Sequence, residues 1–123
     1  MKIFEDYRGR SVRLTDERLV HLENQHPEMV GQLDRISQTL KMPDKIIQSK
    51  TDKTVDLFYN HYKTTPVSEK ILCVVVKTSG DDNFVITAYY TDTVKNPGPK
   101  DLALPLPPGR GLHKVLWSIG VLE

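Results

Sequence analysis

The spacing of the apolar residues changes once along this chain, near Pro43. Before this proline, apolar residues recur at steps of three or four, the spacing of one helix face: Met29, Leu33, Ile36 and Leu40. After it, apolar and polar residues alternate with a period of two, which is the spacing of a half-buried strand. Helices followed by strands, rather than alternating with them, indicate an α+β fold in which helices pack on an antiparallel sheet.

Two helices are predicted in the first third of the chain. Thr15 is a typical N-cap residue, and the acidic residues that follow it favour the positive end of the helix dipole. Pro27 disfavours helical geometry at the residue before it, so this first helix should end near Gln25. Pro27 also suits the first position of a second helix, which should end before Pro43.

Four strands are predicted after Pro43, and turn residues separate them. They cover residues 46–47, 55–62, 71–76 and 84–91, with a hairpin turn at 79–83 between the last two. The segment 71–76 is apolar throughout, which is typical of a central strand covered on both faces. Short connections favour an up-and-down antiparallel sheet. Residues 10–14 are either a short strand or an extended lead-in to the first helix.

The C-terminal tail, residues 96–123, has a different character. Proline and glycine interrupt it repeatedly, which suits core strands poorly. Its apolar residues are too numerous to be left in water, so we expect it to pack on the domain or to form a homodimer with a second copy. A chain of 123 residues fits one domain, 1–123, whose core spans about residues 12–95.

Composition argues against several classes of protein. The net charge is +1, so a nucleic-acid site would need a local basic patch rather than a whole-molecule field. One cysteine forms no internal disulfide, and no apolar segment is long enough to span a membrane. Without a recognisable signal peptide, we expect a cytoplasmic protein with no membrane partner. The histidines and the cysteine do not have the spacing of a zinc site, so we expect neither a metal nor another cofactor.

His21 and His26 are the first candidates for chemistry, because histidine exchanges protons near neutral pH. A five-residue step on a helix places them about 140° apart, so they do not hold one metal together. Each is therefore either a proton-transfer group or an ordinary surface or capping histidine.

Polar side chains on the last predicted strand form a second candidate group. Thr87, Tyr89 and Thr91 share one face, with Lys77 on the neighbouring strand and Lys95 just beyond. Hydroxyl and ammonium groups bind phosphate through charge-assisted hydrogen bonds. The alternative is an ordinary solvated sheet face, since Thr and Tyr suit pleated surfaces.

Aromatic and basic residues on an earlier strand form the third group. Tyr59 and Tyr62 lie close to His61 and Lys63. Such side chains stack on unpaired bases, although cross-strand aromatic packing is the alternative.

Several short motifs occur in a recognisable order. They are residues 15–18, His21-Leu22, His-Pro-Glu-Met at 26–29, Leu40, Pro-Asp-Lys-Ile at 43–46, residues 70–77 and 85–91, and Lys95. Together they resemble a family of phage-associated nuclease-fold domains grouped with barnase, EndoU, colicin ribonucleases and RelE toxins. Leu19 and Gln25 depart from the pattern, which more often has an aromatic residue at the first position and a basic one at the second.

The resemblance implies a RelE/barnase-like fold with two N-terminal helices packed on a four-stranded antiparallel sheet. It also implies a metal-independent endoribonuclease in which the RNA 2′-hydroxyl attacks the adjacent phosphate. The catalytic residues expected on this basis are His21, His26, Thr87, Thr91 and Lys95. The expected substrate-binding residues are Lys77, Tyr89 and Tyr59.

Two other readings use the same fold. In one, the domain is a non-catalytic module that binds a protein partner through its sheet face or its tail, which the near-neutral charge favours. In the other, it is a toxin-like ribonuclease that a cognate protein inhibitor or antitoxin silences. RNA is the expected partner of the enzyme, and a protein is the expected partner of the interaction module.

Overall fold

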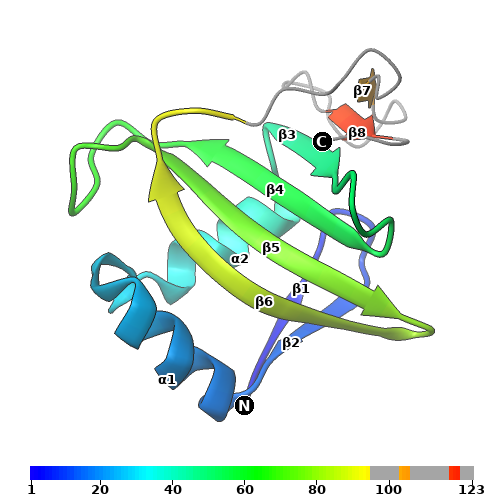
Figure 1. The fold of residues 1–123 in the computed structure, drawn as a ribbon, viewed down its shortest axis with the longest axis horizontal. Coiled ribbons are helices and arrows are strands. Elements are labelled where there is room, and N and C mark those ends of the chain that lie inside the picture. The colour runs from blue at the N-terminus through cyan, green and yellow to red at the C-terminus, as the bar shows by residue number, and fades with distance from the viewer. Residues whose placement is uncertain (95–102, 106–116, 120–123) are drawn as a thin grey trace.

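The computed structural model describes residues 1–94, 103–105 and 117–119 (Figure 1). The helical elements in these residues are α1 (Asp16–Gln25), the 3₁₀ turn η1 (Pro27–Met29) and α2 (Leu33–Lys41). The strands are β1 (Lys2–Glu5), β2 (Ser11–Leu14), β3 (Lys45–Gln48), β4 (Val55–His61), β5 (Ile71–Ser79), β6 (Asp82–Thr91), β7 (Ala103–Pro105) and β8 (Trp117–Ile119).

The first six strands form one mixed sheet in the order β1-β2-β6-β5-β4-β3. Its pairings are antiparallel except for the parallel pairing of β2 with β6. The prediction of a four-stranded, wholly antiparallel sheet behind two N-terminal helices was therefore wrong in strand number, in one pairing and in chain order. The α+β class and the strands β3 to β6 were predicted correctly.

The hairpin of β1 and β2 precedes α1 and supplies the two additional strands. β2 was considered as a short strand, but β1 was not predicted, because four residues carry little periodic signal. The parallel pairing covers only the start of β6, where Val12 and Arg13 lie opposite Asn83 and Phe84. α1 and η1 also contact β6.

The first helix matches its local sequence signals. The Thr15 hydroxyl accepts a hydrogen bond from the Arg18 N–H at 3.1 Å, as expected of an N-cap. The helix ends at Gln25, and the following His26 leaves helical geometry with φ −133° and ψ 78°. The restriction that Pro27 imposes on the preceding residue explains this end.

The start of the second helix was predicted wrongly. Pro27 begins only the three-residue turn η1, and the chain then reverses at Gly31, where φ is +78°. The helix itself starts at Leu33 and ends at Lys41, before Pro43 as predicted. The buried apolar residues here are Met29 in the turn and Ile36 and Leu40 in the helix.

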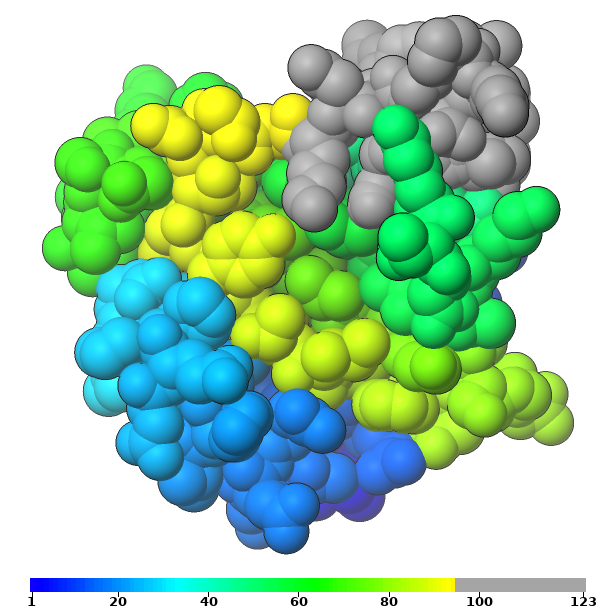
Figure 2. Space-filling view, viewed as in Figure 1, coloured from blue at the N-terminus to red at the C-terminus, as the bar shows by residue number. Residues whose placement is uncertain are grey.

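The two faces of the sheet have different neighbours. The α2 face carries Phe58, Val74 and Ala88, which lie side by side on β4, β5 and β6. On the same face Tyr90 donates a hydrogen bond to Gln32 at the start of α2, and Figure 1 shows α2 behind the sheet. The front face, towards the viewer in Figures 1 and 2, carries the row Tyr59, Cys73 and Tyr89.

A bulge in β6 changes the expected alternation. Val75 lies opposite Thr87, but Val76 lies opposite Val85, so Ile86 is an additional residue. Val85 is consequently buried on the α2 face, whereas a strict two-residue alternation would place it on the same face as Thr87. Thr87, Tyr89 and Thr91 still share the front face, as predicted.

Part of the C-terminal tail lies outside the described residues. Its described segments, β7 and β8, pair with each other in a separate antiparallel two-stranded sheet, and β8 contacts β3. In the residues that the structure describes, no helix has both the length and the apolar character needed to cross a membrane.

Candidate nuclease site

The end of α1 brings His26 onto the front face of the sheet. Its imidazole ring lies against the Tyr89 ring, with 5.5 Å between the ring centroids and 31° between the planes. Thr87 and Thr91 lie two residues before and after Tyr89, so all three strand side chains and the imidazole share one surface. An imidazole that follows the end of α1 and hydroxyls carried by β6 thus come together, which local sequence spacing alone does not determine.

Glu28 is the carboxylate beside this imidazole. Its Oε2 lies 3.8 Å from His26 Nδ1, and its side chain is only 19 % exposed. This separation is too long for a hydrogen bond, but with Glu28 on the Nδ1 side, Nε2 is the ring nitrogen on the opposite side. In the sequence, Glu28 stands out only as part of the His-Pro-Glu-Met motif, because its approach to Nδ1 depends on the turn η1.

Thr87 carries an unusual hydroxyl. Its Oγ1 is buried and has no hydrogen-bond partner among the residues that the structure describes. Folded proteins leave few buried polar atoms unsatisfied, and ligand sites are among the places where they occur. Thr91 differs, because its hydroxyl donates to the Thr93 carbonyl and accepts from the Thr93 N–H, both at 3.2 Å.

The remaining candidates for catalysis lie elsewhere. His21 is exposed on α1, where it lines a hollow of about 250 Å³ with Glu17 and Arg18. Lys95 lies outside the described residues. Among the described residues, the structure therefore brings His26 together with Thr87, Tyr89 and Thr91, whereas His21 lines a different hollow.

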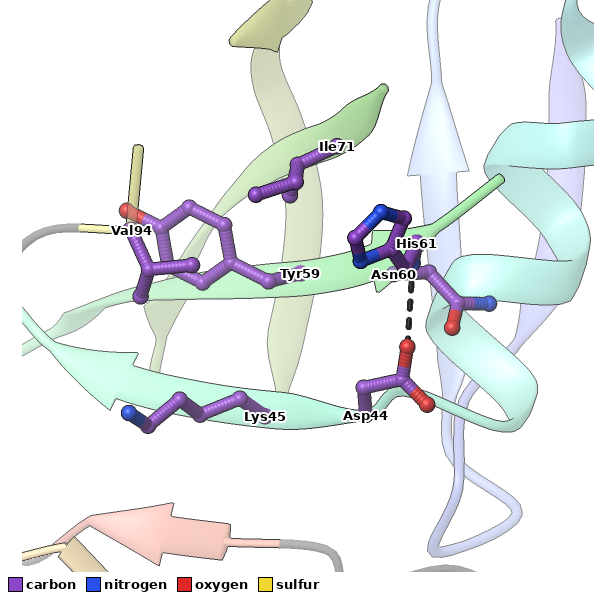
Figure 3. A pocket seen from close by; sticks show the side chains of 7 residues that line it. All are labelled: Asp44, Lys45, Tyr59, Asn60, His61, Ile71 and Val94. Carbon is purple, nitrogen blue, oxygen red and sulfur yellow. Dashed lines mark hydrogen bonds between the residues drawn. The ribbon is translucent and has the colours of Figure 1, made fainter. Parts of the chain in front are cut away.

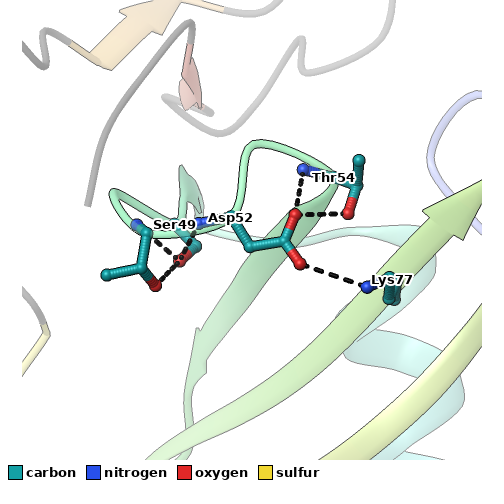
Figure 4. Close-up of polar contacts among 5 residues, drawn as sticks. Ser49, Asp52, Thr54 and Lys77 are labelled. Atoms are coloured by element: carbon teal, nitrogen blue, oxygen red, sulfur yellow. Dashed lines mark hydrogen bonds and ion pairs between the residues drawn. The ribbon is translucent and has the colours of Figure 1, made fainter.

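Lys77 points from the front face of β5 to the loop between β3 and β4 (Figure 4). Its ammonium group donates to Asp52 Oδ2 at 3.1 Å. Asp52 also accepts hydrogen bonds from the Thr54 hydroxyl and N–H, and these bonds together with Lys77 lower the pKa of Asp52 to about 2. The lysine charge is thus already matched by a carboxylate that stays ionised at neutral pH.

A second hollow, of about 210 Å³, lies at the start of β3 and the end of β4 (Figure 3). Its lining residues are Asp44, Lys45, Tyr59, Asn60, His61, Ile71 and Val94. Asp44 accepts a hydrogen bond from the His61 N–H at 2.9 Å and donates its own N–H to the Tyr59 carbonyl at 2.8 Å. Tyr59 was predicted as a binding residue, but Asp44 and Lys45 were not, because only the sheet register brings them beside it.

No three or more histidine, cysteine, aspartate or glutamate side chains of the described residues form a group that could hold a metal ion. A family model described as phage-Barnase-EndoU-ColicinE5/D-RelE like nuclease2, or PBECR2, matches residues 1–102. The chain belongs to the PBECR2 family. No curated protein and no solved structure matches it.

Membership of the PBECR2 family confirms the resemblance found from the short motifs. The matched residues extend further towards the N-terminus than those motifs did, and they include the hairpin of β1 and β2. The family description makes this a phage-associated, nuclease-like domain of the barnase, EndoU, colicin and RelE type. Such a domain has a nucleic acid as its class of substrate.

Proposed function

We propose that this protein is an endoribonuclease that cleaves RNA by attack of a 2′-hydroxyl on the adjacent phosphate, without a metal ion. The observation that carries the proposal is the contact between His26 and Tyr89. Through this contact the His26 imidazole lies beside Tyr89, and Thr87 and Thr91 lie two residues before and after Tyr89 on the same face. This grouping supports a reaction centre on the front face. Membership of a nuclease-like family supports the same class of reaction.

The reaction forms a bond between phosphorus and O2′ and breaks the bond between phosphorus and O5′. The 2′-hydroxyl loses a proton to a base, and the departing O5′ gains a proton from an acid. The products are a 2′,3′-cyclic phosphate and a free 5′-hydroxyl. We assign one proton transfer to Nε2 of His26, whose Nδ1 lies 3.8 Å from the Glu28 carboxylate, and keep His21 as the candidate for the other.

Negative charge grows on the phosphate oxygens during this attack. The Thr87 hydroxyl is the proposed donor to these oxygens, because it has no hydrogen-bond partner among the described residues, although its buried Oγ1 would have to turn outward to reach a phosphate. Tyr89 would donate its phenol or stack on a base, and Thr91 would donate only after leaving Thr93. Lys77 would have to leave Asp52 to reach a phosphate, and Lys95 is the other proposed cation.

The experiment is a cleavage assay on single-stranded and structured RNA with EDTA present. We expect cleavage with 2′,3′-cyclic phosphate ends and none of a DNA of the same sequence, because DNA lacks the attacking hydroxyl. His26→Ala should lower kcat about 10²–10⁴-fold, the usual value of general acid–base catalysis. Thr87→Val, which keeps the side-chain shape, should lower it about 10²-fold.

Gln25→Ala is the matched control, because Gln25 is exposed at the end of the same helix. It should cleave like the wild type. Thermal unfolding of each variant separates loss of catalysis from loss of fold. Unchanged cleavage by folded His26→Ala would remove the imidazole from the mechanism, and absence of any RNA cleavage by the wild type would refute the proposed function.

A further inference from the structure

The hollow beside Tyr59 has the mixed lining of a ligand site. Tyr59, Ile71 and Val94 give it apolar walls, whereas Lys45 and His61 bring an ammonium group and an imidazole to its rim. Figure 3 shows the Tyr59 and His61 rings and Ile71 on one side and the β3 residues on the other. Mostly apolar walls with a few polar groups are typical of small-molecule sites.

The volume limits what this hollow holds. At about 210 Å³ it is smaller than the roughly 300–1,000 Å³ of pockets that take drug-sized ligands. It therefore suits one flat ring system with polar edges rather than a whole nucleotide. The hydrogen bond from the His61 N–H to Asp44 holds the carboxylate at the rim, where it can accept from an exocyclic amine.

The hollow lies on the same face as the candidate reaction centre. Tyr59 lies opposite Cys73, which lies opposite Tyr89, so two strand spacings of about 4.8 Å separate the two tyrosine backbones. Ile71 of the hollow also lies directly opposite Thr91. The two sites are thus neighbours across β5, about one nucleotide apart rather than at opposite ends of the molecule.

We propose that this hollow is a nucleobase subsite that binds the base next to the cleaved phosphate in single-stranded RNA. This inference rests on the proposed function for its link to cleavage. The His61 ring stacks on the base, and Lys45 and Asp44 hydrogen-bond to its polar edge. An unpaired base is required, because the edge and the faces of a base inside a duplex are covered.

Methyl NMR of the full chain tests base binding separately from cleavage. The probes are the four free ribonucleosides and a 2′-deoxy tetranucleotide, which lacks the attacking hydroxyl. We expect the Ile71 and Val94 methyl signals to shift with saturation, while the exposed Val20 methyls on α1 stay unchanged. If all three residues respond equally, or none responds to either probe, the subsite does not exist.

Variants of the residues that line the hollow test whether it contributes to RNA cleavage. Lys45→Ala/His61→Ala should weaken tetranucleotide binding and raise KM for RNA by about 5- to 100-fold, with kcat within about twofold of wild type. Lys53→Ala is the control, because Lys53 is exposed in the loop between β3 and β4 and does not line the hollow. An unchanged KM for the double variant would overturn the subsite even where RNA is cleaved.

The two proposals fail in different ways. If the wild type cleaves no RNA but the Ile71 and Val94 signals shift with free nucleosides, the ribonuclease proposal fails and base binding remains. If RNA is cleaved and these signals never move, the ribonuclease proposal stands and the subsite is wrong.

Discussion

The Asp56 carboxyl group has a raised pKa. Desolvation raises the pKa of Asp56 from 3.8 to about 6, because the carboxyl group is largely buried on β4. The positive charges of Arg10 and Arg8 oppose this rise, and the nearby Asp6 adds to it. The charged carboxylate is therefore unfavourable in the folded protein.

A raised carboxyl pKa makes the fold less stable at higher pH. Between about pH 4 and 6 the native state binds more protons than the unfolded state, so the free energy of unfolding falls as pH rises. Asp56→Asn removes this ionisation. We expect the variant to be more stable than wild type by on the order of 1–2 kcal/mol at pH 8, with the gain fading below about pH 4. Urea unfolding from pH 3.5 to 8 measures it.

Asp52→Asn provides the opposite case. The pKa of Asp52 is lowered to about 2, so its ionised form favours the fold above about pH 4, and that contribution disappears as pH falls towards 2. This variant should lose stability at pH 8 rather than gain it. If instead Asp56→Asn has the stability of wild type at pH 8, burial of the Asp56 charge costs the fold no stability.

At the scale of the elements, the junction between η1 and α2 depends on one glycine. Gly31 has φ of +78°, which side chains with a Cβ rarely adopt. A Cβ added there would meet no atom within 4 Å, so the cost of a substitution is conformational and not steric. This junction decides where α2 begins and therefore how Ile36 and Leu40 meet the sheet.

Gly31→Ala should lower the free energy of unfolding by about 1 kcal/mol, because alanine is strained in the left-handed region. Gly31→Asn should lose clearly less, since asparagine tolerates that region better. Urea unfolding of both variants at one pH gives the comparison. Equal losses for both, or none for alanine, would show that the positive φ is not what the junction requires.

At the scale of the whole molecule, the N-terminal hairpin is part of the core. The tip between β1 and β2 reaches the α2 face, where the Tyr7 ring lies 5.9 Å from that of Phe58. Both rings are buried, as is Asp6, which accepts from the Arg8 and Arg10 N–H groups and so shapes the turn. The first ten residues thus complete the packing of strands far along the chain.

Tyr7→Ala should therefore destabilise the whole domain by about 3 kcal/mol, as other large-to-small changes at buried aromatic positions do. Arg8→Ala is the control, because Arg8 is exposed and only lies over the Tyr7 ring, a contact worth about 0.5 kcal/mol. Thermal or urea unfolding measures both. A Tyr7→Ala loss no larger than that of Arg8→Ala would mean that the hairpin is not part of the core.

Local signals in the sequence determined a large part of this fold. Thr15 and Pro27 predicted the two ends of α1, alternating residues predicted β4 and β6, and the apolar residues 46–47 and 71–76 predicted β3 and β5. The same alternation placed Thr87, Tyr89 and Thr91 on one face. These features depend on neighbours a few residues apart, which a single sequence contains in full.

The tertiary structure alone decided the rest, because it depends on pairs that are distant in sequence and that only the folded chain brings together. The parallel pairing of β2 with β6 joins residues about seventy positions apart, and a four-residue strand carries no signal for it. The same holds for the ring contact between His26 and Tyr89 and for the Asp52 carboxylate that engages Lys77. The sequence contains the reactive groups, and the pairing of the strands determines which of them come into contact.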